Sequence, residues 1–171
     1  MVDISGLSAR QLLKLHAAIE CQLIKLKIIR TANNPTGDLA EYLFCMAFPD
    51  WVQEGNSQAH YDAIGPAPDN LNTKVKYQIK GRRLTHNKSR QLSAIRDLKE
   101  KHFDFLAGVL FNEDYSVSKA ILIPHAVVLK LATPDEHVNG HRFLLRDDVW
   151  DDRWKVEGVV DVTAKLQSVW Q

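Results

Sequence analysis

Hydrophobic residues recur at three- and four-residue intervals near the start of the chain. This is the spacing of one face of an α-helix. The residues that have it are Leu12, Leu15, Ile19, Leu23 and Leu26. Ser8 and Gln11 just before this run have the spacing of a capping box. We therefore expect an amphipathic scaffold helix from about residue 8 to about residue 30, with no chemistry of its own.

A second helix is expected to begin at Asn34-Pro35. Asn is a favourable N-cap, and Pro is favoured at the first helical position. The helix should reach about residue 47, with an apolar arc made of Leu39, Ala40, Leu43, Phe44 and Ala47. Glu41 falls at the border of this arc. Its carboxylate can either reach a site beneath the helix or remain an ordinary surface glutamate.

The pattern then changes to the two-residue alternation of β-strands. Residues 59–64 and 75–82 are expected to form an antiparallel pair, because the turn-rich segment 65–70 separates them. In the second strand, one face should carry Lys76, Gln78, Lys80 and Arg82. The opposite face carries Val75, Tyr77 and Ile79, which can pack into a core.

The remaining pattern predicts a helix over 90–101, two central strands over 103–111 and 117–123, and a short helix from Pro124 to about Leu131. A strand over 141–146 and a terminal helix over 161–170 complete the chain. This order favours an α/β (α+β) fold, with a mixed central sheet and helices on both faces. At 171 residues, one domain over 1–171 is expected. Its parts are a scaffold helix (1–34), a core (35–130) and a C-terminal strand and helix (131–171).

Composition and targeting signals narrow the class of protein. Cys21 and Cys45 lack the spacing of a zinc site and are expected to be buried thiols. The chain shows no signal-peptide pattern and no apolar run long enough to cross a bilayer. These features predict a cytoplasmic protein with no membrane partner.

The net charge of +1 hides a strong asymmetry between two segments. Residues 74–101 contain ten Lys or Arg against two acids, whereas residues 135–161 contain eight acids against four bases. A basic segment of this kind is typical of proteins that bind a phosphate-rich partner, although a solvated lysine-rich face has the same composition. The acidic stretch around Asp147-Asp148 and Asp151-Asp152 is expected to face away from such a partner or to contact another chain.

Four neighbouring groups are suited to hydrolysis of a phosphodiester. Asp62 supplies a carboxylate, Gln78 a side-chain oxygen and Ile79 a backbone carbonyl, all of which are ligands that Mg²⁺ accepts. Lys80 supplies a cation that can stabilise charge on the phosphate and orient a water. Glu41 can complete the metal shell directly or through a water. His60 and His125 have the chemistry of a general base, but one-metal nucleases of this type need no histidine and lone histidines are commonly structural.

The series Glu41, Asp62, Gln78-Ile79-Lys80 resembles the PD-(D/E)xK nuclease pattern over about residues 35 to 85. The resemblance implies a restriction endonuclease-like core and catalytic residues Asp62, Gln78, Lys80 and Glu41. It also implies Mg²⁺, or Mn²⁺ as a substitute, held by Asp62, the Ile79 carbonyl, Glu41 and Gln78. Two positions depart from the pattern: Tyr61 stands in place of the family's Pro, and Gln78 in place of Asp or Glu.

The function that follows is a Mg²⁺-dependent endonuclease acting on double-stranded DNA, most like a small type II restriction enzyme. Because one chain has one site, cutting both strands implies a homodimer whose twofold axis matches a palindromic sequence. A structure-specific resolvase, a repair nuclease and an inactive DNA-binding domain on the same fold remain open. The residues expected to contact DNA are Arg82, Arg83, His86, Lys88 and Arg90.

Overall fold

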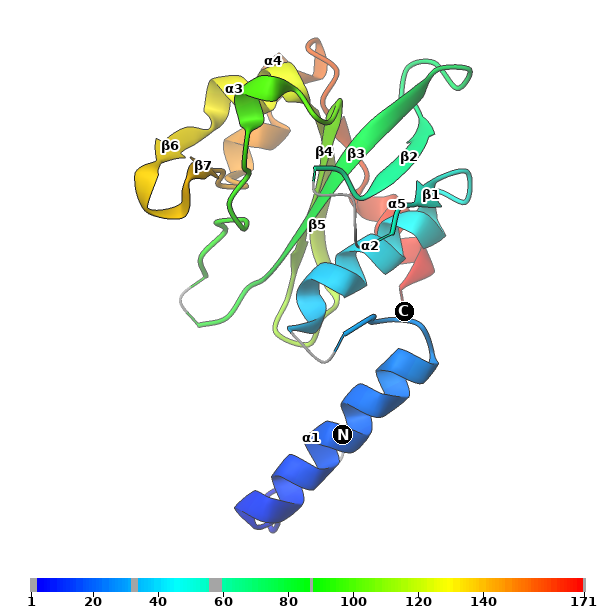
Figure 1. The fold of residues 1–171 in the computed structure, drawn as a ribbon, viewed down its shortest axis with the longest axis vertical. Helices are drawn as coiled ribbons and strands as arrows, with labels where there is room; N and C mark the ends of the chain where they lie inside the picture. Colours follow the sequence, from blue (N-terminus) through cyan, green and yellow to red (C-terminus); the bar gives the residue numbers. More distant parts are fainter. Residues whose placement is uncertain (1–2, 32–33, 56–59, 87, 171) are drawn as a thin grey trace.

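The computed structural model describes residues 3–31, 34–55, 60–86 and 88–170, and its centre is a six-stranded sheet (Figure 1). The strand order is β1-β2-β3-β4-β5-β8, with β3 parallel to β4 and all other neighbours antiparallel. The expected mixed central sheet is therefore confirmed. The strands of this sheet are β1 (Val52–Gln53), β2 (Ala63–Pro66), β3 (Lys74–Arg83), β4 (Phe105–Phe111), β5 (Val117–Pro124) and β8 (Val160–Asp161). Ala59, the expected first residue of the strand before β3, lies outside the described residues.

Helices cover both faces of the sheet (Figure 1). One face packs against α2 and α5, through a core that includes Leu43, Phe44 and Leu166. The other face packs against α3 and the irregular segments on either side of a small β6-β7 hairpin. The helices and remaining strands are α1 (Ala9–Lys25), α2 (Pro35–Ala47), α3 (His125–Leu131), α4 (Asp152–Lys155), α5 (Thr163–Val169), β6 (Thr133–Asp135) and β7 (Gly140–Arg142).

The close packing of α2 on β3 depends on Gly81. A Cβ atom at this position would lie 2.8 Å from the Thr36 carbonyl oxygen and 2.9 Å from Ala40 Cβ. The missing side chain lets the helix lie directly over the strand. The start of α2 follows the sequence expectation, since Asn34 Oδ1 accepts a hydrogen bond from Thr36 N–H at 3.0 Å and Pro35 is the first helical residue.

Two helical expectations need correction. Helix α1 has the predicted capping box at Ser8 but ends at Lys25, and it has no buried residue. It extends away from the sheet (Figure 1). The predicted helix over 90–101 is wrong. This segment is extended up to a single 3-10 turn at Leu98–Glu100. Leu92 N–H and Ile95 N–H donate instead to the carbonyls of Phe143 and His141.

Of two strand predictions, the one for 141–146 is confirmed only in part and the one for the β2-β3 pair is confirmed. The strand predicted over 141–146 is short, because β7 ends at Arg142 and pairs with β6, while Leu144 forms one isolated bridge to Gln91. The antiparallel pairing of β2 with β3 is confirmed, with Ala63 opposite Tyr77. Among the described residues, no helix is both long enough and apolar enough to cross a membrane.

Candidate functional site

Asp62 lies where strand β2 stops covering the edge of strand β3. Pairing between these strands joins Ala63–Pro66 to residues 74–77, so β3 beyond Tyr77 has no β2 partner. One further backbone hydrogen bond joins the two segments, from Asp62 N–H to the Tyr77 carbonyl at 2.8 Å. The Asp62 side chain is therefore held against the open edge of β3.

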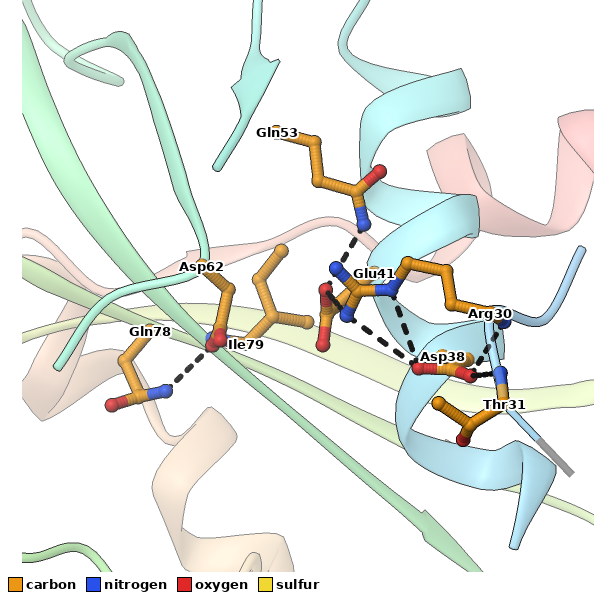
Figure 2. Close-up of polar contacts among 8 residues, drawn as sticks. All are labelled: Arg30, Thr31, Asp38, Glu41, Gln53, Asp62, Gln78 and Ile79. Carbon is orange, nitrogen blue, oxygen red and sulfur yellow. Dashed lines mark hydrogen bonds and ion pairs between the residues drawn. The ribbon is translucent and has the colours of Figure 1, made fainter. Parts of the chain in front are cut away.

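The Asp62 carboxylate uses one oxygen to cap this edge. Its Oδ2 atom accepts the Ile79 backbone N–H and the Gln78 side-chain Nε2, each at 2.6 Å (Figure 2). None of the described residues donates a hydrogen bond to Oδ1. Asp62 thus combines an anchored oxygen with an oxygen that is free to accept a ligand.

Gln78 is oriented differently from the sequence expectation. Its side chain is buried (9% exposed), and its amide nitrogen, rather than its oxygen, points toward Asp62 (Figure 2). The amide N–H₂ is the only part of this side chain that can donate to a carboxylate. A half-turn of the amide plane exchanges the two atoms, so this side chain can present either its nitrogen to Asp62 or its oxygen to a cation at the same place.

Glu41 reaches the same region from helix α2. Its Oε2 accepts hydrogen bonds from Arg30 Nη2 at 2.5 Å and from Gln53 Nε2 at 3.0 Å (Figure 2). Burial and the nearby negative charge of Asp62 raise the pKa of Glu41, against the opposing effects of Gln53 and Arg30. Two carboxylates that repel each other in a partly buried place form a favourable environment for a cation.

Arg30 was not anticipated as a member of this site. The Arg30 guanidinium lies between Glu41 and Asp38, and Asp38 Oδ2 also accepts the backbone N–H groups of Arg30 at 2.7 Å and Thr31 at 3.1 Å (Figure 2). The segment after α1 is therefore tied to the first turns of α2. No local sequence pattern signals this pairing, because it depends on how the chain returns past α2.

Helix α2 and strand β3 enclose a polar cavity of about 750 Å³. Its wall includes four of the residues singled out from the sequence as metal ligands or catalytic groups, namely Glu41, Asp62, Ile79 and Lys80. Gln78 is not part of the wall. The cavity continues past Arg82 and Arg83, so a basic surface leads directly away from the acidic end.

The predicted DNA-contacting residues are held by neighbouring groups. Arg82 Nε donates to the Ser89 carbonyl at 3.2 Å, and Arg83 Nε donates to the Glu113 carbonyl at 2.8 Å while its guanidinium lies over the Tyr115 ring. Both arginines still line the cavity. These contacts orient the two guanidinium groups.

The other three predicted DNA contacts, His86, Lys88 and Arg90, do not line the cavity. His86 lies 3.8 Å from Glu113, and Lys88 is exposed. Arg90 forms an ion pair with Asp147 at 2.8 Å. The acidic stretch therefore does not point entirely away from the basic segment, because one of its members contacts it directly.

His125 has the structural role expected of it. It is buried, its Nε2 lies 2.7 Å from the Leu98 carbonyl oxygen, and Phe103 packs edge-on against its ring. His60 instead stacks on His102, and this pair was not anticipated from the sequence.

No protein-family model matches this chain, and no curated protein matches its sequence. The functional interpretation therefore depends on the residues of the site and their geometry.

Proposed function

We propose that this protein is a Mg²⁺-dependent endonuclease of double-stranded DNA, most like a small type II restriction enzyme. The observation that carries the proposal is the convergence of Glu41, Asp62, Ile79 and Lys80 on one cavity wall. These residues come from helix α2, the segment before β2 and strand β3, three elements that are distant in the sequence. A carboxylate pair with a lysine and a basic surface beside it suits a metal and a phosphate.

The donor set fits a hard dication. Asp62 Oδ1 accepts no hydrogen bond from the described residues, and the raised pKa of Glu41 reflects burial together with repulsion from Asp62. The Ile79 carbonyl belongs to the part of β3 that β2 leaves uncovered. Asp62, Glu41 and the Ile79 carbonyl would hold Mg²⁺ or Mn²⁺, with Gln78 able to add its amide oxygen. When bound, the ion would supply Lewis-acid polarisation of the phosphate and a more acidic water.

The remaining chemistry belongs to side chains of the protein. Lys80 lies in the same wall, where its ammonium group can neutralise charge on a non-bridging phosphate oxygen and orient the attacking water. Arg82 and Arg83 continue along β3 and can bind the adjacent phosphates of the same strand. Asp62, held through Oδ2 by Ile79 N–H, needs no reorganisation to present Oδ1.

Cleavage of both strands would require two copies of this single site. A homodimer with a twofold axis provides them and matches the symmetry of a palindromic DNA sequence. A structure-specific resolvase or a repair nuclease would use the same residues. Substrate preference separates these activities, because a restriction enzyme cuts plain duplex into discrete fragments whereas a resolvase requires branched DNA.

One observation favours a second candidate, an inactive DNA-binding domain on this fold. Asp62 already caps the open edge of β3, and Arg30 already neutralises Glu41. Both acids therefore have a structural role that does not need a metal. In that case Gln78 in place of an acid would mark the loss of catalysis.

Substitution of Lys80 distinguishes the two candidates. We expect Lys80→Ala to lower cleavage of duplex DNA by about a hundredfold or more, since a group that stabilises transition-state charge is worth that much. DNA binding should be retained within a few-fold. The matched control is Lys74→Ala, which removes an exposed lysine from the start of the same strand.

Cleavage by Lys80→Ala at the rate of the wild-type protein would overturn the assignment of the site. Wild-type protein that binds DNA but never cleaves it, with Mg²⁺ or with Mn²⁺, would favour the inactive domain.

A further inference from the structure

We propose that His60, Asp97 and His102 form a second metal site, which binds a transition-metal dication of the Zn²⁺ type. The inference is independent of the nuclease proposal, because it uses none of the residues assigned to that site. One potential ligand atom from each of the three side chains lies within 4.8 Å of the other two. The imidazole rings of His60 and His102 are stacked, with their centroids 4.0 Å apart and their planes inclined by 26°.

The ligand atoms of this group are free to bind an ion. Among the described residues, no hydrogen bond or ion pair involves the side chains of His60, Asp97 or His102. The two histidines are half-buried and Asp97 is exposed, so an ion can enter from solvent and still contact partly desolvated ligands. With metal–ligand bonds of about 2.0 Å, tetrahedral geometry places ligand atoms roughly 3.3 Å apart. Because the two rings are stacked, the histidine side chains would have to rotate to point a nitrogen of each ring at the same ion.

The ligand types decide which ion is favoured. Imidazole nitrogen suits Zn²⁺, Co²⁺, Ni²⁺ and Cu²⁺, whereas Mg²⁺ prefers a shell made of oxygen ligands. Two imidazoles and one carboxylate therefore select against the ion proposed at Asp62. Three protein ligands also leave one tetrahedral position for a water or an exogenous ligand.

Two of the ligands are held by an anchored framework. Asp97 precedes the 3-10 turn Leu98–Glu100 and has φ +48, a backbone conformation that Asp tolerates better than most residues. The Leu98 carbonyl oxygen lies 2.7 Å from His125 Nε2, and the neighbouring Phe103 is buried. The turn that carries Asp97 and the residue after His102 are both fixed against the core.

The same framework is bonded to β3. Asp104 N–H donates to the Lys76 carbonyl at 2.9 Å, and Asp104 Oδ2 accepts Lys76 N–H at 2.9 Å. His102 therefore lies at the entrance to β4, in a position fixed by the neighbouring strand. His60 completes the group from the segment that leads into Asp62 and β2.

A bound ion would join two parts of the chain that have no sequence proximity. It would fasten the segment before β2 to the segment before β4, across strand β3. Because His60 is two residues from Asp62, the ion would also restrain the backbone that presents Asp62. We therefore expect it to stabilise the folded protein, as any ligand that binds only the folded state does.

Zinc titration of the full chain tests this site. Calorimetry with ZnCl₂ should show one equivalent bound, and Co²⁺ should give the visible absorption of a four- or five-coordinate ion. His60→Gln and His102→Gln should each weaken Zn²⁺ binding by about tenfold or more and remove the cobalt absorption. The matched controls are His16→Gln, a histidine on exposed α1, and Asp62→Asn, which removes the carboxylate charge of the proposed Mg²⁺ site and leaves the three proposed Zn²⁺ ligands in place. Both controls should bind Zn²⁺ as the wild-type protein does.

Two results would overturn the second site. One is unchanged Zn²⁺ affinity in His60→Gln and His102→Gln. The other is loss of Zn²⁺ binding in Asp62→Asn, which would assign the ion to the site around Asp62. If a histidine variant fails to fold, imidazole nitrogen NMR of the wild-type protein provides the decision. Zn²⁺ should shift the signals of His60 and His102 and leave that of His16 in place, whereas unshifted His60 and His102 signals would contradict the proposal.

Discussion

At the scale of single residues, Gln78 provides a hydrogen-bond donor to the Asp62 carboxylate in the metal-free site. A glutamate at this position would place a third carboxylate beside Asp62 and Glu41. The amide instead donates a hydrogen bond to Asp62 Oδ2 at 2.6 Å, so Asp62 is stabilised by a neutral partner. If the site binds Mg²⁺ as proposed, Gln78 lowers the affinity for the ion and stabilises the metal-free site.

Replacing Gln78 by glutamate should lower the stability of the metal-free protein and raise its affinity for Mg²⁺. We expect Gln78→Glu to lower the free energy of unfolding in EDTA by roughly 1–3 kcal/mol, because a buried hydrogen bond is replaced by repulsion between carboxylates. The Mg²⁺ concentration needed for half-maximal effect should fall by about tenfold, because a charged carboxylate replaces a neutral amide oxygen among the ligands that Mg²⁺ accepts. Urea denaturation with and without Mg²⁺ measures both effects. Equal stability of the variant in EDTA and in Mg²⁺ would contradict the placement of the ion beside Gln78.

Cys45 provides a chemical reporter one turn of α2 beyond Glu41. The pKa of the Cys45 thiol is raised to about 11, mainly by partial burial and to a smaller extent by the negative charge of Glu41. Cys21 is exposed on α1, so the expectation that it is a buried thiol is wrong. Only the thiolate is alkylated, and we therefore expect iodoacetamide to modify Cys21 quickly at pH 8 and Cys45 slowly. The rate at Cys45 should increase by about tenfold per pH unit as the pH rises toward this pKa.

Mass spectrometry of peptides separates the two cysteines. Glu41→Gln should accelerate alkylation of Cys45, because it removes a charge that disfavours the thiolate. Equal rates at both cysteines at pH 8 would contradict the half-buried position of Cys45 beside Glu41.

Residue types were predictable from the sequence at this site, but their partners were not. The spacing of Asp62, Gln78 and Lys80 followed from strand alternation, and Glu41 followed from the border of a helical arc. Two features required the three-dimensional structure. These are the capping of Ile79 N–H by Asp62 and the insertion of Arg30 between Glu41 and Asp38. Both depend on contacts between segments that no local pattern encodes.

At the scale of elements, the position of Glu41 relative to β3 depends on how closely α2 packs. Gly81 permits this approach, because a Cβ there would lie 2.8 Å from the Thr36 carbonyl oxygen, which is backbone and cannot rotate away. The helix and the strand carry the two halves of the proposed site. A change in their separation should therefore alter stability and activity together.

Gly81→Ala tests this dependence. We expect it to lower the free energy of unfolding by about 1–3 kcal/mol, the usual cost of overpacking, and to reduce cleavage because Glu41 is displaced from Asp62. Gly37→Ala is the matched control in α2, since nothing lies within 4 Å of its Cβ position. It should be neutral or should stabilise the protein by up to about 1 kcal/mol. A stable, fully active Gly81→Ala variant would contradict the close packing of α2 on β3.

The segment 90–101 shows why element prediction failed in one place. Leu92, Ile95 and Leu98 are spaced by three residues and are all buried, which fits one face of a helix. Leu92 and Ile95 instead form backbone hydrogen bonds with Phe143 and His141, about fifty residues later in the chain. Pairing with a distant segment therefore outweighed the local helical pattern of 90–101. The β2-β3 pair, in contrast, was predictable because its two strands are close in sequence.

At the scale of the whole molecule, the basic segment 74–101 and the acidic segment 135–161 are in contact through the ion pair of Arg90 with Asp147. Asp147 accepts from Lys119 Nζ at 2.6 Å and pairs with Arg90 at 2.8 Å, and these two contacts lower the pKa of Asp147 to about 2. The basic surface that leads away from the proposed site is therefore shortened by an internal acid. The near-neutral net charge of the chain is consistent with this arrangement.

Removing this acid should strengthen DNA binding. We expect Asp147→Asn to raise the affinity for duplex DNA a few-fold at low salt, because Arg90 and Lys119 become available for phosphates. The slope of log affinity against log salt should steepen by about one unit for each added phosphate contact. Asp148→Asn is the matched control, since it removes the same charge from a residue whose nearest cation, Arg153, is 3.6 Å away. Fluorescence anisotropy at several salt concentrations measures both variants, and identical slopes for the two would contradict a role for Arg90 in DNA binding.

The most direct test of the proposed function is incubation of the purified protein with supercoiled plasmid and with phage DNA, in Mg²⁺ and in EDTA. The site formed by Glu41, Asp62, Ile79 and Lys80 predicts discrete DNA fragments in Mg²⁺ and intact DNA in EDTA. Nicking or a smear would instead assign a repair or nonspecific nuclease to the same residues. Intact DNA in Mg²⁺ and in Mn²⁺, with DNA binding retained, would contradict the account and leave Asp62 as a cap for the edge of β3.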